Sequence, residues 1–64
     1  MNKTQRRVLQ YLLEKPDISV NALAEILNVS PRTIERALLY LRQANIIQRV
    51  GNKKKGSWLV VKGE

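Results

Sequence analysis

Hydrophobic residues recur at helical spacing in three successive segments of the chain. In the first segment the apolar positions are Val8, Leu9, Leu12 and Leu13. Asn2 is a good N-terminal cap, and Gln5 follows three positions later, as in a capping box. Because Pro16 cannot continue a helix, the pattern predicts a helix over about residues 3–15.

The second segment predicts a short helix that begins after Ser19, another residue that caps helices well. Its expected inner face comprises Val20, Leu23, Ala24 and Leu27. Ile18, directly before the cap, is expected either to pair as a very short strand or to pack against the entry of the helix. Asn28 tolerates the left-handed conformation that ends helices, so a sharp turn should follow.

The third segment begins at Ser30 and Pro31, a cap followed by a proline that suits the first helical position. The prediction is a helix over residues 31–43. Its two faces are clearly separated when successive residues are turned by about 100°. The packing face comprises Ile34, Ala37, Leu38 and Leu41, and the opposite face Arg32, Glu35, Arg36, Leu39 and Gln43.

A β-hairpin is predicted after the third helix. Asn45 repeats the left-handed stop, and residues 46–50 and 57–61 read as strands around a basic loop that is bounded by Gly51 and Gly56. Ile47 should face the helices, and Trp58 should share a face with Val60, although the opposite parity, with Leu59 and Val61 inward, is an open alternative. The sequence thus predicts a mainly α fold with a small β-hairpin in one domain over residues 1–64, either as a whole chain or as part of a larger protein.

The residue composition narrows the function. Lys and Arg number 12 against 5 Asp and Glu, and this net charge of +7 favours a polyanionic partner. Because the sequence contains no Cys and no His, we expect no enzyme, no metal site and no cofactor. No apolar stretch approaches the roughly 20 residues of a membrane helix, and the N-terminus lacks the apolar segment of a secretory signal. We therefore expect a cytoplasmic protein without membrane contact.

The middle of the chain resembles the helix-turn-helix signature. The matching positions are Leu23-Ala24-x-x-Leu27-Asn28-Val29-Ser30-x-x-x-Ile34-x-x-Ala37-Leu38. This spacing puts a small residue where two helices cross closely, and a turn residue four positions later. The family often has Gly where this sequence has Asn28 and Asn45, and Asn preserves the same backbone conformation.

Over residues 4–61, the order of helix, helix-turn-helix and basic hairpin resembles the winged helix-turn-helix family of transcriptional regulators. The segment from Arg49 to Val60 looks like the wing of small domains that form the C-terminal part of larger predicted prokaryotic regulators. The resemblance implies binding to double-stranded DNA, with the helix at 31–43 in the major groove and the wing at 51–57 on the backbone or in the minor groove. Strong specificity would then require a homodimer or an attached domain.

The candidate DNA-binding residues follow from their chemistry. The start of the third helix, at Ser30 and Thr33, offers hydroxyl and N–H groups to a phosphate, although Ser30 serves equally well as a cap alone. Arg32 and Arg36, one turn apart, can grip guanine or a pair of phosphates, unless Glu25 on the preceding helix pairs with Arg36. Three cations at the wing tip suit phosphate contact: Lys53, Lys54 and Lys55.

Two more residues on this helix have competing interpretations. Glu35 can accept a hydrogen bond from cytosine N4 or orient Arg32, and we favour the orienting role. Leu39 can touch a thymine methyl group or pack against the first helix or a dimer partner, and we favour packing. Tyr40 has the same two interpretations.

Other functions stay open at the level of sequence. A winged helix that serves protein–protein interaction or dimerisation without binding DNA would use an apolar contact formed by Leu39, Tyr40 and Ile46. RNA or single-stranded DNA binding is less favoured, because the few aromatic residues are expected in structural positions. Arg6 and Arg7 either add backbone contacts or belong to the ordinary surface.

Overall fold

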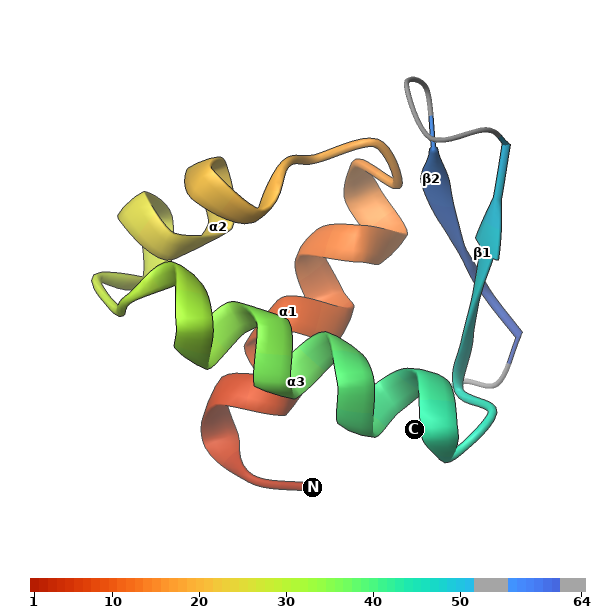
Figure 1. The fold of residues 1–64 in the computed structure, drawn as a ribbon, viewed down its shortest axis with the longest axis horizontal. Helices are drawn as coiled ribbons and strands as arrows, with labels where there is room; N and C mark the ends of the chain where they lie inside the picture. Colours follow the sequence, from red (N-terminus) through yellow and green to blue (C-terminus); the bar gives the residue numbers. More distant parts are fainter. Residues whose placement is uncertain (52–55, 62–64) are drawn as a thin grey trace.

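The computed structural model describes residues 1–51 and 56–61, over which three helices precede an antiparallel hairpin. The elements are α1 (Lys3–Glu14), α2 (Val20–Leu27), α3 (Pro31–Gln43), β1 (Ile47–Val50) and β2 (Ser57–Val60). Figure 1 shows the helices grouped together, with the hairpin standing beside the C-terminal end of α3. The predicted mainly α fold with a small hairpin is confirmed.

The first two helices begin at the predicted side-chain caps. The Asn2 carboxamide oxygen accepts a hydrogen bond from the Gln5 backbone N–H at 2.8 Å, and the Gln5 side chain accepts one from the Asn2 N–H at 3.0 Å. Ser19 Oγ accepts from the Ala22 N–H at 3.0 Å. These bonds satisfy N–H groups that have no partner within a helix, so local chemistry fixes where α1 and α2 start.

Two asparagines set the chain direction after α2 and α3. Asn28 has φ 57° and ψ 48°, and Asn45 has φ 61°, so both adopt the predicted left-handed conformation. The Asn28 N–H bonds back to the carbonyls of Ala24 and Glu25. Asn adopts this conformation more readily than other residues with a Cβ atom, which explains its place at both turns.

The core lies where the three helices meet the first strand. Its buried members are Val8, Leu9, Leu12, Leu23, Ala24, Leu27, Ile34, Ala37, Leu38, Leu41 and Ile47. The predicted packing face of α3 and the inward position of Ile47 are thus confirmed, and Val20 packs half-buried against this core. Of the four apolar positions of the first segment, Leu13 alone lies outside the core, and 60% of it is exposed. It follows Leu12 by about 100° around α1 and falls outside the narrow buried stripe.

The hairpin contacts the helices through one of its two faces. Ile47 pairs with Val60, and Trp58 and Val60 pack partly buried against the core. Leu59 and Val61 are about half exposed, so the parity with Trp58 and Val60 inward is confirmed. Each strand is one residue shorter than predicted, although a hydrogen bond from the Val61 N–H to the Ile46 carbonyl, 2.8 Å long, continues the pairing.

One hydrogen bond ties β2 to the segment between α1 and α2. The Trp58 N–H donates to the Pro16 carbonyl at 2.9 Å. Ile18 does not form the short strand that was one of its two predicted roles, and it packs partly buried against the core. Its other predicted role, a contact with the entry of α2, stays a prediction. The hairpin is therefore held against the helices at Pro16 as well as through its apolar face.

Candidate nucleic-acid interface

The start of α3 is organised by two hydroxyl groups. Ser30 Oγ accepts a hydrogen bond from the Thr33 N–H at 3.3 Å, and the two hydroxyl oxygens lie 3.0 Å apart. Pro31 occupies the first helical turn. The capping role of Ser30 is confirmed, and phosphate contact by Ser30 and Thr33 stays a prediction.

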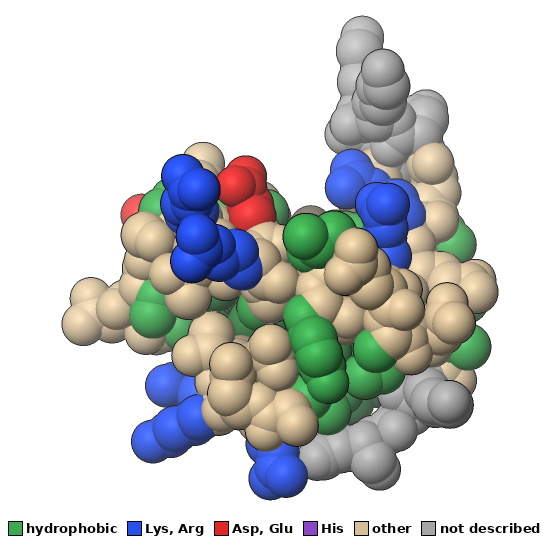
Figure 2. Space-filling model, turned by 60° about the horizontal axis from the view of Figure 1, so that its bottom comes forward, with side chains coloured by type: hydrophobic (Ala, Val, Ile, Leu, Met, Phe, Trp, Pro, Cys, Tyr) green, Lys and Arg blue, Asp and Glu red, His purple; other side chains and the backbone are tan. Residues whose placement is uncertain are grey.

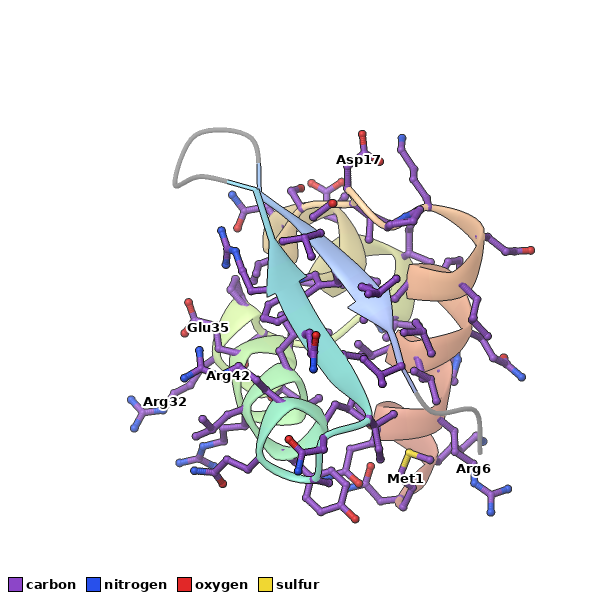
Figure 3. The ribbon with its side chains drawn as sticks, turned by 90° about the vertical axis from the view of Figure 1, so that its right-hand side faces the viewer. Met1, Arg6, Asp17, Arg32, Glu35 and Arg42 are labelled. Atoms are coloured by element: carbon purple, nitrogen blue, oxygen red, sulfur yellow. The ribbon has the colours of Figure 1, made fainter. Side chains whose placement is uncertain are left out.

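The solvent-facing side of α3 has the composition that the sequence predicted. Arg32, Glu35, Arg36 and Leu39 are all exposed and together line a shallow hollow. Within the part of the chain that the structure describes, neither arginine makes an ion pair. Figure 3 shows Arg32 extending away from the molecule rather than toward Glu35. Both guanidinium groups are therefore available to an external anion.

Neither of the two carboxylates that could have paired with these arginines does so in the described part of the chain. Among the described residues Glu35 makes no contact that would orient Arg32, so the favoured role for Glu35 is not what the structure shows. Glu25 lines a separate hollow together with Asn28 and Pro31, and over residues 1–51 and 56–61 it makes no ion pair with Arg36.

A second hollow joins the outer side of α3 to the hairpin. It is lined by Val20, Glu35, Leu38, Leu39, Arg42, Arg49 and Trp58. Because Glu35 and Leu39 line both hollows, one continuous surface runs from the start of α3 to the Arg49–Trp58 pair of the hairpin. We call this surface the arginine face and define it by Arg32, Glu35, Arg36, Leu39, Arg42 and Arg49. In Figure 2, two groups of cationic side chains lie on either side of hydrophobic side chains.

Arg49 is held in place by its surroundings. Its Cζ atom lies 5.3 Å from the centroid of the Trp58 ring, a cation–π distance. The guanidinium also lies against Gly56, where an added Cβ would come within 2.6 Å of Nε and 2.7 Å of Nη2 of Arg49. A side chain at residue 56 would therefore displace the Arg49 guanidinium, which is the movable end of a flexible side chain.

Sequence reasoning missed Arg42 and Arg49 as members of this face. Arg42 follows Leu39 by three positions and Glu35 by seven, so helical spacing alone could have found it. Arg49 stands opposite Trp58 in the hairpin, but its proximity to α3 depends on how the hairpin packs, which no local pattern reveals.

Leu39 and Tyr40 correct another expectation. Leu39 is 50% exposed and Tyr40 42%, so neither is buried against α1. The inner side of α3 is already filled by Leu38 and Leu41, which are buried. Leu39 and Tyr40 lie on the exposed part of the helix surface. Packing of Leu39 against a dimer partner stays a prediction.

Several predicted cations are not part of the arginine face. Arg6 lies on the opposite side of the molecule from Arg32 (Figure 3). Arg7 lines a hollow formed by α1 alone, with Tyr11 and Glu14 among its neighbours. The wing-tip residues Lys53, Lys54 and Lys55 lie outside the described residues.

The described residues also limit the chemistry at the surface. They contain no group of three or more Asp, Glu, His or Cys residues arranged to hold a metal ion. In the same part of the chain, no helix combines the length and the apolar character needed to cross a membrane. What the arginine face offers is cationic hydrogen-bond donors around an apolar centre.

This architecture defines a class of protein. A left-handed turn joins α2 to α3, and an antiparallel hairpin stands beside α3, which together make a winged helix-turn-helix domain. The family described as winged helix-turn-helix DNA-binding matches residues 1–48, and the chain belongs to this family.

Solved structures share the fold at low sequence identity. The chain is similar to MepR, a transcription regulator of the Staphylococcus aureus multidrug efflux pump MepA, with a TM-score of 0.75 and 19% identity. It is also similar to MepR in the S. aureus MepR–DNA complex, with a TM-score of 0.74 and 18% identity. Each match covers 95% of this chain and 47% of the other, so the chain spans about half the length of MepR. No curated protein is significantly similar in sequence.

Proposed function

We propose that this domain binds double-stranded DNA as the non-catalytic, DNA-reading part of a cytoplasmic transcriptional regulator. The observation that carries the proposal is the pair Arg32 and Arg36, which are exposed one turn apart on α3 and make no ion pair within the described residues. Membership of a DNA-binding family supports the proposal, and so does the likeness in fold to a protein solved in complex with DNA.

In this proposal α3 lies in the major groove, which is wide enough to admit a helix. Arg32 and Arg36 hydrogen-bond to guanine O6 and N7 or bridge phosphates, because a guanidinium presents its donors in a planar fork. Ser30 and Thr33 lie at the N-terminus of α3, where backbone N–H groups and the helix dipole favour a phosphate. These four residues set the position of the helix on the duplex.

The hairpin supplies a second contact in the same proposal. The wing over residues 51–57, with Lys53, Lys54 and Lys55, lies on the backbone or in the minor groove beside the site of α3. Arg49, which lines the hollow between α3 and the hairpin, adds a cation between these two contacts. The net charge of +7 favours such a partner over an uncharged one.

Chemical-shift mapping with a duplex tests this proposal. In a titration of the ¹⁵N-labelled chain, amide shifts should change over residues 30–43 and 51–57 and stay constant around Arg7, which lies in a hollow of α1 away from the arginine face. Shifts confined to other residues would overturn the assignment.

Sedimentation separates DNA binding from the alternative of a protein-interaction domain. The proposal predicts that the chain binds a duplex. A tight dimer without duplex binding would favour the alternative, for which Leu39 and Tyr40 are exposed but Ile46 is partly buried against the core.

A further inference from the structure

Leu39 occupies an unusual position for an exposed leucine. It lies where two rows of side chains on α3 cross, one formed with Arg32 and Arg36 and the other with Glu35 and Arg42. Both rows follow the spacing of three or four residues that makes helix side chains neighbours. Half of Leu39 is exposed at this crossing, surrounded by charged side chains that make no ion pair in the part of the chain the structure describes.

We infer that Leu39 is a specificity-determining residue that contacts the 5-methyl group of a thymine in the major groove. This inference rests on the proposed function, and it names a base contact that the proposed function does not specify. In the major groove the thymine methyl is the apolar group that a base edge presents, whereas the other groups there are hydrogen-bond donors and acceptors. An apolar side chain at the centre of a DNA-binding face gains affinity from that methyl.

The charge around Leu39 decides between DNA and a second copy of this chain as the occupant. Arg32, Arg36, Arg42 and Arg49 surround Leu39 with cations, and Glu35 is the one acidic residue on the arginine face. A second copy would bring its own net charge of +7 against this surface, which is unfavourable. A duplex instead brings phosphates to the arginines and places the base edges between its two strands, opposite Leu39.

The test compares two pools of random-sequence duplex, one containing thymine and the other uracil in its place. Uracil keeps every hydrogen-bonding group of thymine and lacks only the methyl. After selection with the whole chain, we expect a thymine preference at one position of the site. Affinity should fall about fourfold when uracil replaces thymine there, which corresponds to roughly 0.8 kcal/mol for one methyl group removed from water.

The variant L39A should bind the thymine and uracil duplexes equally. Leu13→Ala is the matched control, because Leu13 is also an exposed helical leucine but lies in a hollow of α1 with Arg7 and Glu14. L13A should keep the fourfold preference. Circular dichroism should show that both variants remain folded.

The possible outcomes separate this inference from the proposed function. Binding without any difference between thymine and uracil overturns the role of Leu39 and leaves DNA binding intact. A dimer that L39A dissociates and L13A does not would also overturn that role, since a second copy then covers Leu39. Failure to bind either pool overturns the proposed function and the inference together.

Discussion

The third helix and the hairpin present their cations in opposite ways. On α3 the backbone is fixed by a capped start and four buried residues, while Arg32 and Arg36 extend into solvent. In the described part of the hairpin Ile47 is the single buried residue, but the Arg49 side chain is fixed against Trp58 and Gly56. The helix with a buried inner side thus carries exposed arginines that make no ion pair in the described part of the chain, whereas the less buried hairpin holds its arginine by stacking on Trp58.

This difference predicts which substitutions change stability and which change binding. Changes on the outer side of α3 remove contacts with a ligand and leave the core intact. Changes beneath α3 remove buried apolar area from a chain of 64 residues, which has little stability to spare. Changes around Arg49 alter the position of one cation and have only small effects on stability and on binding.

The largest expected effect separates two leucines of α3. Leu41 is fully buried and Leu39 is half exposed. Leu41→Ala should lower the free energy of unfolding by about 3 kcal/mol, because a cavity is left in the core. Leu39→Ala should change it by less than about 0.5 kcal/mol. Urea denaturation of both variants measures the two values. Similar losses of unfolding free energy would show that Leu39 contributes to the packing of the domain.

The next effect concerns binding. Replacing Arg32 and Arg36 together with alanine should weaken duplex binding by about 2 kcal/mol, or roughly 30-fold, at unchanged unfolding free energy. Arg7→Ala removes the same kind of charge from a separate surface and should have a much smaller effect. Fluorescence anisotropy with a labelled duplex gives these affinities. A loss for R7A that is half the loss for the double variant would mean that only net charge matters, since R7A removes one positive charge and the double variant removes two.

A smaller effect distinguishes the two roles of Ser30. Ser30→Ala removes the cap of α3 and should destabilise the domain by about 1 kcal/mol. Ser30→Asp keeps a capping oxygen and should retain stability, yet its negative charge should weaken duplex binding if a phosphate lies at this helix start. Thermal unfolding and anisotropy on the same samples provide both readings. Unimpaired binding by S30D would exclude the phosphate contact.

The smallest effect tests the fixed cation of the hairpin. Gly56→Ala should push the Arg49 guanidinium away from Trp58, and Arg49→Ala should remove it. Each change should cost roughly 0.5 kcal/mol of stability, as expected for an exposed cation–π contact. Because Trp58 is the one tryptophan in the sequence, its fluorescence emission reports the loss directly. Gln48→Ala, on the neighbouring exposed position, is the control that should leave the emission unchanged.

Features with local causes could be predicted from the sequence. The caps at Asn2, Ser19 and Ser30 and the left-handed turns at Asn28 and Asn45 depend on groups within a few positions along the chain. The buried side of α3 could also be predicted from the sequence, since helical periodicity alone places its apolar residues on one face.

Features that depend on packing between elements were not predictable in the same way. Leu13 and Leu39 are as hydrophobic as the core residues, and their exposure reflects where the neighbouring helices cross. Arg49 joins the arginine face only because the hairpin packs beside α3. A sequence pattern gives the face of an element, but not which other element will meet it.

The salt dependence of duplex binding tests most directly whether Arg32 and Arg36 contact the DNA backbone. For the unmodified chain, the logarithm of the association constant should fall steeply with the logarithm of salt concentration, by about 0.9 per phosphate neutralised. The double variant R32A/R36A should show a slope shallower by about one or more, while R7A keeps the original slope. An identical slope in all three proteins would contradict contact between these two arginines and the DNA backbone.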